Sequence, residues 1–550
     1  MEHKPRILRS KLYLYLTEFF AGMAVMAVEL GASRLLAPYF SSSQIVWTII
    51  ISTIMIAMAL GNIYGGRSAD KNPDPDRLYR RLLIAAVWIA AIPVLGKYII
   101  LLITGVLIVT ISSNLLVIAG FLACMIIFVF PCFLLGTVTP SLARFTVKSQ
   151  DDSGRTVGTL GAFNTIGSII GTFLPTFVTI PAVGTAVTFL LFSGILLVLG
   201  LLYFLSGKRK LVSCMVALIL YVICAVFGNR SNFAFWEKSL VFEGESIYNY
   251  LQVKEDQESV ILSTNVLFGV QSIMKKDNSL SGMYYDYAMA APLLAGIRPE
   301  GTGDVLILGM GTGTYAKQCL HYFPGLTVEG VEIDEKITDL ARTYFQEPAE
   351  AVVTTYDGRA YLQTIDRSYD VIMVDAFQDI TIPFQMASVE FFTLVREHLN
   401  PGGVMVVNMN MRASGEGTIN EYLQDTIASV FPEVAVVDVT GYTNRELFAS
   451  MDKLDTKRLF IQTENAKTEM QPDSAGKPAA DLADLSGLMQ HVSENLISCE
   501  KPAQARILTD DKAPVELLSM RAIDQIIQQE LTYYKEVYKR DGIQGILQSI

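Results

Sequence analysis

Long uninterrupted apolar runs constrain this chain more than any other feature. Gln44–Gly66 and Leu115–Gly136 contain no charged residue. About 20 consecutive apolar residues, at ~1.5 Å of helix each, cross the ~30 Å hydrocarbon core of a bilayer, whereas helices buried in soluble cores are usually shorter. Because such runs recur and 51% of all residues are hydrophobic, the first 228 residues predict a multi-pass bundle in a lipid membrane.

Seven spans are expected in this region, at roughly 12–31, 44–66, 81–110, 115–136, 158–180, 184–206 and 211–228. The third is over-long and contains Pro93, which predicts a kink or a re-entrant piece. The fifth carries small residues at spacings that let two helices approach closely, so we expect them at a packing interface. These residues are Gly158, Gly161, Gly167 and Gly171.

Charge divides the chain at the same place. Residues 1–228 hold 17 basic and 8 acidic residues, and the remainder holds 26 basic and 46 acidic residues. An acidic second part argues against a nucleic-acid partner, which needs a basic surface, and is compatible with a small cationic substrate. The six cysteines and four histidines lack the close spacing of a metal site, so neither a metal nor a disulfide framework is expected.

The remaining residues predict a small β-sheet followed by an α/β domain. Short strands joined by polar turns occupy residues 229–275. From Asp304 onward, apolar strands alternate with helices, a pattern typical of a parallel sheet covered on both faces. We therefore divide the chain into a transmembrane helical domain (1–228), a small β-strand part (229–275) and a Rossmann-like, doubly wound domain (276–550).

A glycine-rich turn marks the candidate binding site. The strand Val305–Leu308 runs into Gly309, Gly311 and Gly313, and a helix follows. Glycines at this turn let the backbone approach a ligand closely. The loop lacks the Gly-x-Gly-x-x-Gly form of dinucleotide-binding loops. It therefore favours an adenosine without pyrophosphate over a dinucleotide, and its spacing matches S-adenosylmethionine-type sites.

Acidic residues follow the next strands. Glu332 lies 21 residues after Gly311, where a carboxylate can accept hydrogen bonds from ribose hydroxyls, and Asp357 and Asp375 follow later. Because the carboxyl ends of parallel strands meet at one edge, these side chains are expected to line one crevice. The alternative interpretation is that they only cap helices in a fold without a ligand.

Several further stretches are typical of one enzyme family. They are Glu245-Ser246-Ile247-Tyr248-Asn249, Gly269-Val270-Gln271, Tyr284-Tyr285-Asp286 and Pro292-Leu293. Over about residues 243–412 the chain resembles the polyamine aminopropyltransferase, or spermidine synthase, family. The whole chain resembles the bacterial membrane-fused members of that family, in the stretches Glu29, Arg34-Leu35-Leu36, Pro38, Gly61, Gly65-Gly66, Leu508-Thr509-Asp510-Asp511 and Pro514-Val515-Glu516.

The resemblance implies transfer of an aminopropyl group from decarboxylated S-adenosylmethionine to a small cationic diamine such as putrescine, without a metal. It implies that Asp375 accepts the proton of the amine, that Glu332 holds the ribose and that Asp357 holds the adenine amino group. The nucleotide-binding set is then Gly309, Gly311, Gly313, Glu332, Asp357 and Gln271. The substrate-binding set is Tyr284, Asp286 and Asp379.

The chain departs from the family pattern at three positions. Thr312 replaces the aspartate of the glycine loop, Gln378 replaces the second aspartate of the catalytic loop, and Tyr285 stands where Gln or His is usual. Two other functions stay open: a methyltransferase that uses S-adenosylmethionine, and a transporter or sensor that binds a nucleotide without turnover. A homo-oligomer is also possible.

The membrane side of the catalytic domain is an open question in the sequence. Basic loops place the N-terminus in the cytoplasm, and seven crossings would then place the domain outside. The nucleotide donor, however, is made in the cytoplasm. A failed crossing at Leu211–Gly228 or a double crossing in the third segment would resolve the conflict. The supply of donor favours a multi-pass protein of the cell membrane with a cytoplasmic catalytic domain.

Overall fold

The computed structural model describes residues 10–40, 43–110, 114–147, 153–207, 210–228, 232–266, 270–376, 382–410, 416–461, 482–499 and 506–549. The chain forms two compact units, one of residues 1–238, 243–250 and 265–268 and the other of 239–242, 251–264 and 269–550. The three-part division predicted from the sequence stays a prediction, and most of the small sheet joins the second of the two units.

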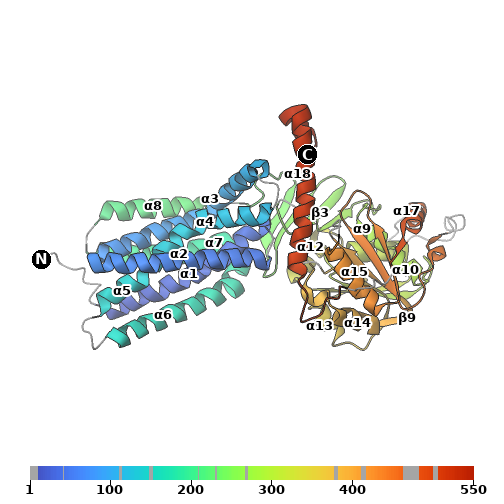
Figure 1. The fold of residues 1–550 in the computed structure, drawn as a ribbon, viewed down its shortest axis with the longest axis horizontal. Helices are drawn as coiled ribbons and strands as arrows, with labels where there is room; N and C mark the ends of the chain where they lie inside the picture. The colour runs from blue at the N-terminus through green and yellow to red at the C-terminus, as the bar shows by residue number, and fades with distance from the viewer. Residues whose placement is uncertain are drawn as a thin grey trace. The chain divides into compact units, whose positions relative to one another are not determined.

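The first unit consists of helices that run alongside one another (Figure 1). They are α1 (Lys11–Phe40), α2 (Gln44–Lys71), α3 (Pro75–Thr110), α4 (Leu115–Gly136), α5 (Val138–Thr146), α6 (Ser153–Leu174), the π-helical turn η2 (Pro175–Thr179), α7 (Ile180–Ser206) and α8 (Leu211–Gly228). Pro93 lies inside α3, which is a single helix, so the expected re-entrant piece is not observed in that segment. Within the described residues, six helical segments are long and apolar enough to cross a membrane.

The longest of these segments, Ser153–Ser206, contains a turn. Gly184 has φ +79° and breaks the helical geometry there. The hydroxyl of Thr188 donates to that of Thr179 over 2.9 Å, although nine residues of straight helix would separate the two by ~13 Å. The chain therefore turns back near Gly184, at the boundary predicted between the fifth and sixth spans.

Two of the predicted packing glycines bring α1 and α6 into backbone contact. A Cβ atom on Gly167 would lie 2.0 Å from the carbonyl oxygen of Phe19, and one on Gly171 would lie 2.2 Å from that of Met23. A Cβ atom on Gly158 or Gly161 would meet nothing within 4 Å. The packing prediction is thus confirmed for the second pair of glycines and not for the first.

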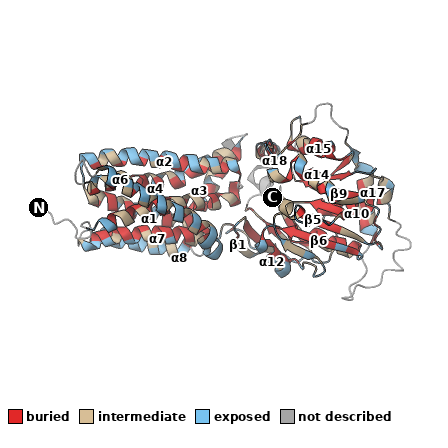
Figure 2. Ribbon diagram, turned by 90° about the horizontal axis from the view of Figure 1, so that it is seen from below, coloured by how far each residue is buried: buried red, intermediate tan, exposed pale blue. Residues whose placement is uncertain are grey.

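The outward surface of this unit is apolar. Met55, Leu102 and Val212 are 64%, 69% and 69% exposed, and Figure 2 shows exposed residues along the outer faces of the helices. Soluble monomers rarely expose contiguous apolar patches larger than a few hundred Å². The exposed side chains of α2 and α8 are therefore suited to an apolar surrounding.

The second unit is built on an eight-stranded sheet with the order β12-β10-β11-β9-β8-β5-β6-β7. The strands are β5 (Gly303–Leu308), β6 (Leu326–Glu332), β7 (Val352–Thr355), β8 (Tyr369–Val374), β9 (Leu399–Met409), β10 (Glu433–Asp438), β11 (Arg445–Ser450) and β12 (Ile497–Ser498). Strands β5 to β9 pair in parallel and β11 pairs antiparallel with β9. The strand order reverses between β5 and β8, which is where open α/β sheets bind ligands.

Helices accompany this sheet along the chain. They are α9 (Tyr284–Ala288), α10 (Ala290–Leu294), α11 (Thr314–Tyr322), α12 (Glu335–Tyr344), α13 (Gly358–Leu362), α14 (Val389–Glu397), α15 (Ile419–Val430), α17 (Leu482–Asn495) and α18 (Val515–Ser549), with 3-10 turns η3 (Phe384–Met386) and η4 (Thr456–Leu459). Residues of α9, α10, α11 and α17 share one hydrophobic core with residues of the central strands. The expected doubly wound α/β fold is therefore observed.

A second, four-stranded sheet contains β1 (Leu240–Glu245), β2 (Tyr250–Glu255), β3 (Ser259–Ser263) and β4 (Ser272–Lys275) in sequential order. Its apolar face packs on α12, where Leu251, Val260 and Leu262 share a buried cluster with Leu340 and Phe345. This contact explains why most of the small sheet belongs to the second unit.

Candidate active site

The glycine-rich loop after β5 has the backbone that its sequence predicts. Gly309, Gly311 and Gly313 have φ values of +90°, +56° and +75°, which favour glycine. A Cβ atom on Gly309 would lie 2.4 Å from the carbonyl oxygen of Asp375, whereas one on Gly311 would meet nothing within 4 Å. The loop therefore packs tightly against the end of β8 and is open at Gly311, where a ligand can approach the backbone.

Glu332, at the end of β6, lies beside this loop. Its carboxylate accepts hydrogen bonds from the backbone N–H of Gly311 (2.8 Å) and of Asp334 (3.0 Å). Burial raises the pKa of Glu332, and the two backbone hydrogen bonds oppose that shift. The structure thus brings together the strand-end acid and the glycine loop that the sequence predicted as one site.

Asp375 follows β8 and is held by two side chains. Tyr284 Oη donates to Asp375 Oδ2 over 2.5 Å, and Asn408 Nδ2 donates to Oδ1 over 2.9 Å. Asp375 keeps part of its surface open, yet burial of its carboxyl group raises its pKa to about 7. Glu332 raises this pKa further, and the hydrogen bonds from Tyr284 and Asn408 lower it. A carboxylate with a pKa near neutrality is suited to accept a proton.

Two residues of this site were missed by the sequence analysis. Asn408 lies near the end of β9 and accepts a hydrogen bond from Asn444 Nδ2 (3.0 Å). Glu446, in β11, is paired directly with Asn408, is 0% exposed, and neither of its carboxylate oxygens has a hydrogen-bond partner among the described residues. Burial, and then the charge of Asp375, raise the pKa of Glu446 well above its usual range. An acid directly before the apolar stretch Leu447–Ala449 was the available signal.

Two other predicted site residues, Asp357 and Gln271, have structural contacts. Asp357 caps α13 by accepting a hydrogen bond from Ala360 N (2.8 Å), as the helix-cap alternative expected. Gln271 is half-buried, and its backbone N–H donates to Leu262 O (2.9 Å). Both residues stay predictions as nucleotide contacts.

Asp286 is fully buried. Its carboxylate accepts hydrogen bonds from Ser281 Oγ (3.1 Å), Gly282 N (2.5 Å) and Gln318 Nε2. These contacts anchor the loop before α9 to α11. The structure gives Asp286 this anchoring role, and a contact with substrate stays a prediction.

Two of the three positions that depart from the family pattern, Thr312 and Tyr285, carry neutral hydroxyl groups. Thr312 Oγ1 contacts Ser272 Oγ and lies 3.1 Å from Thr314 Oγ1. Tyr285 Oη donates to Ile273 O (2.6 Å) and fastens β4 to α9. Neither residue places a charge at the site.

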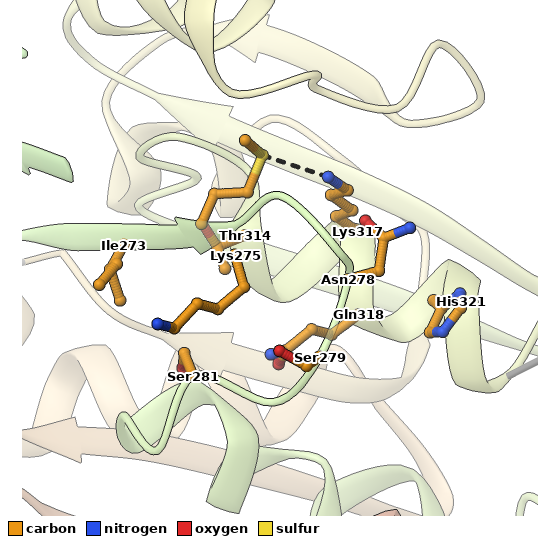
Figure 3. A pocket seen from close by; sticks show the side chains of 10 residues that line it. Ile273, Lys275, Asn278, Ser279, Ser281, Thr314, Lys317, Gln318 and His321 are labelled. Atoms are coloured by element: carbon orange, nitrogen blue, oxygen red, sulfur yellow. Dashed lines mark hydrogen bonds between the residues drawn. The ribbon is translucent and has the colours of Figure 1, made fainter. Parts of the chain in front are cut away.

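A pocket lies on the α11 side of β4 (Figure 3). Ser281 and Gln318, which hold Asp286, are among its lining residues, together with Lys275, Lys317 and His321. The residues around Asp375 do not line it. Asp379 and Gln378 lie outside the described residues, and the described part of the chain contains no cluster of acidic, His and Cys side chains able to hold a metal ion.

Comparison with known proteins identifies the family. Residues 289–453 match the spermine/spermidine synthase domain. A probable polyamine aminopropyl transferase of Bifidobacterium longum is 52% identical over 353 residues, covering 64% of this chain and 78% of that protein. A polyamine aminopropyltransferase of Vibrio vulnificus is 26% identical over 314 residues, covering 55% of this chain and 98% of that protein. A solved structure of a probable spermidine synthase from Corynebacterium glutamicum matches with a TM-score of 0.35 and 21% identity, covering 40% of this chain and 86% of that one.

The fold, the site and these relatives define a transferase with a Rossmann-like catalytic unit. The chain belongs to the polyamine aminopropyltransferase family, because it is 52% identical to a relative of which it covers 78%. The resemblance stated from the sequence motifs is therefore confirmed.

Proposed function

We propose that this protein is a membrane-bound aminopropyltransferase that uses decarboxylated S-adenosylmethionine and a diamine such as putrescine. The observation that carries the proposal is Asp375, a partly open carboxyl group with a pKa of about 7 at the reversal of strand order. It lies next to the glycine loop and is oriented by Tyr284 and Asn408.

The donor fits the residues around the glycine loop. Gly311 leaves open space over the backbone, and the carboxylate of Glu332 lies 2.8 Å from its N–H. A carboxylate in that place accepts hydrogen bonds from ribose hydroxyls. In this proposal the adenosine lies over Gly311 and Glu332, and the sulfonium is directed toward Asp375.

The reaction is a displacement at the carbon bonded to the sulfonium. The lone pair of the neutral amine forms the new C–N bond as the C–S bond breaks. The electron pair of the C–S bond goes to sulfur, which leaves as neutral methylthioadenosine. The attacking nitrogen becomes positively charged and loses a proton to Asp375, which acts as the general base.

Product analysis of the purified full-length protein tests this function. Incubation with decarboxylated S-adenosylmethionine and putrescine should yield methylthioadenosine and a product heavier by one aminopropyl group, measured by mass spectrometry. S-Adenosylmethionine serves as the parallel donor. Methyl transfer from S-adenosylmethionine without any aminopropyl transfer would assign the protein to the methyltransferase alternative. The neutral side chain of Thr312 is compatible with that alternative.

Asp375→Asn is the matched variant, because it keeps the shape of the side chain and cannot accept the proton. We expect turnover to fall ~10²- to 10⁴-fold, the usual contribution of general-base catalysis, with nucleotide affinity nearly unchanged. Near-normal turnover in this variant would remove Asp375 from the mechanism. Binding of nucleotide without turnover by the unmodified protein would favour the transporter or sensor alternative.

The location in the cell membrane is part of the proposal. In the described parts of the chain, six helical segments have the length and composition to cross a bilayer, and the exposed side chains of α2 and α8 include Met55 and Val212. An apolar exterior of this kind is stable in lipid and unstable in water. Recovery of the full-length protein in the soluble fraction without detergent would contradict this location.

A further inference from the structure

Glu18 is a carboxylate enclosed in the helical unit, and the proposed function does not use it. It lies in the first half of α1 and is 0% exposed. Thr139 Oγ1, on α5, donates to Glu18 Oε1 over 2.6 Å, and Asn164 Nδ2, on α6, donates to the same oxygen over 2.9 Å. Three helices therefore meet at this carboxylate, and two of them supply it with hydrogen-bond donors.

The second oxygen of this carboxylate is uncompensated in the described part of the chain. Glu18 Oε2 is buried there without a hydrogen-bond partner. A buried carboxylate is stable only when it is paired and hydrogen-bonded, and ionisable side chains at membrane depth usually mark a functional site. The three helices thus fix one oxygen and leave the other for a positively charged donor.

An aromatic pair lies next to this carboxylate. Tyr15 precedes Glu18 by three residues, so the two side chains are neighbours on one face of α1. The ring of Tyr15 stacks on that of Phe163, with the centroids 5.2 Å apart, and Phe163 directly precedes Asn164 on α6. Aromatic rings attract cations to their faces and also pack against apolar groups. The contact between α1 and α6 therefore combines a carboxylate with an aromatic surface.

A primary ammonium group on an alkyl chain fits these residues. The ammonium group supplies the charge and the N–H donor that Glu18 Oε2 lacks, and the alkyl chain packs on the rings. A hard metal ion needs about six oxygen ligands, whereas the described residues contain no cluster of acidic, His and Cys side chains able to hold one. Thr139 and Asn164 are half-buried, so the ligand reaches Glu18 at the edge that these two side chains cover.

We propose that Glu18 anchors a binding site for a primary alkylammonium ion inside the helical unit, between α1, α5 and α6. Glu18 Oε1 keeps its bonds to Thr139 and Asn164, and Oε2 accepts a hydrogen bond from the ammonium group. The site gives the helical unit a ligand of its own, apart from the catalytic residues around Asp375. This inference does not rest on aminopropyl transfer.

Calorimetry of the full-length protein in detergent tests the site, with n-butylammonium chloride as the ligand and sodium chloride as the ionic control. Glu18→Gln keeps an oxygen for Thr139 and Asn164 to bind, and it replaces Oε2 by a neutral amide nitrogen. We expect this variant to bind n-butylammonium at least tenfold more weakly than the unmodified protein, as for the loss of a charge-assisted hydrogen bond.

Glu29→Gln is the matched control, because it is the same chemical change on the same helix, at a half-buried position. It should bind n-butylammonium as the unmodified protein does. Any binding of n-butylammonium to the catalytic unit is common to all of these proteins and cancels in the comparison.

Tyr15→Leu supplies a second variant, which leaves Glu18 in place. Loss of the aromatic face should weaken n-butylammonium binding ~2- to 30-fold, the range for loss of a cation–π contact. Melting temperatures at pH 8 add a third measurement. Without ligand, Glu18→Gln should melt at or above the temperature of the unmodified protein, because it removes an uncompensated buried charge.

Equal n-butylammonium affinity of the unmodified protein and folded Glu18→Gln, or no binding by either, would overturn the site. If Glu18→Gln does not fold, unchanged binding by Tyr15→Leu has the same meaning. A lower melting temperature of Glu18→Gln without ligand would show that Oε2 already has a partner, and equal binding of sodium would assign the site to a metal ion. Both results would also overturn the proposal. Absence of aminopropyl transfer by the unmodified protein would overturn the proposed function alone.

Discussion

Asp375 combines two opposing influences in one side chain. Burial raises its pKa to about 7, and the hydrogen bonds from Tyr284 and Asn408 limit that rise. A base that is half-protonated near neutrality is available to take a proton and able to release it afterwards. The surrounding residues therefore set the pKa of Asp375 to a value suited to a general base. Two consequences can be measured at single residues.

The first is a pH dependence of the reaction. Asp375 acts only in its deprotonated form, so the slope of log kcat/KM against pH should be one unit steeper below its pKa of about 7 than above it. Deprotonation of the acceptor amine, which titrates at higher pH, adds the same slope on both sides of that inflection. A pH–rate profile of the full-length protein between pH 5 and 9 measures the inflection. The residual activity of Asp375→Asn should show no inflection near pH 7, and an inflection that persists there would assign the titration to another group.

The raised pKa of Asp375 also makes the stability of the protein depend on pH. The folded-state pKa of Asp375 is above its ordinary value of 3.8, so the folded protein holds more protons than the unfolded chain between about pH 4 and 7. The contribution of this group to the free energy of unfolding therefore decreases as pH rises through that interval.

The second consequence concerns Glu332 and the nucleotide. Glu332→Ala removes a charged acceptor, and loss of one such hydrogen bond costs ~1.5–3 kcal/mol. Affinity for the adenosyl nucleotide should fall ~10- to 100-fold by the rule of tenfold per ~1.4 kcal/mol. Calorimetry of the full-length variant measures this change. Unchanged affinity in a folded variant would contradict the assignment of the ribose to Glu332.

At the scale of elements, the contact between α1 and α6 depends on two absent side chains. Gly167 and Gly171 let the helices approach until their backbones touch, because any Cβ atom there would meet the carbonyl oxygen of Phe19 or Met23. Close approach of this kind replaces the hydrophobic driving force that is missing between helices in lipid.

Gly171→Leu should therefore separate the two helices. Overpacking a close contact usually costs ~1–3 kcal/mol, which predicts a lower melting temperature in detergent. Gly161→Leu, on the same helix with nothing within 4 Å of its Cβ position, is the control and should melt like the unmodified protein. Equal melting of both variants would contradict the interface.

At the scale of the whole molecule, the lengths of α3 and α8 bear on the membrane side that we propose for the catalytic unit. The structure makes α3 a single helix from Pro75 to Thr110, so a double crossing of the third segment is not the explanation. Leu211–Gly228 is a helix of 18 residues, about 27 Å long at ~1.5 Å per residue. We keep the proposal of a cytoplasmic catalytic unit, because the nucleotide donor is made there.

Cysteine labelling in intact cells tests this proposal. Glu300→Cys places a thiol at an exposed site of the catalytic unit, and Asn72→Cys places one in the basic connection after α2. In a background with Cys499 replaced, we expect a membrane-impermeant thiol reagent to label Glu300→Cys only after lysis. Labelling before lysis would place the catalytic unit outside, and the result for Asn72→Cys reports whether the basic connection lies on the same side.

The sequence by itself determined the apolar bundle, the parallel sheet and the site around Gly311, Glu332 and Asp375. These features are local, because hydropathy, strand alternation and glycine spacing depend on residues that are close together in the sequence. Only the tertiary structure decided the contacts between distant segments. It placed Glu446 opposite Asn408, joined Asp286 to Gln318 of α11 and brought Gly167 and Gly171, but not Gly158 and Gly161, against α1. Hydropathy gives the length of a segment and the type of its face, whereas pairing register and chain direction depend on which segments pack together.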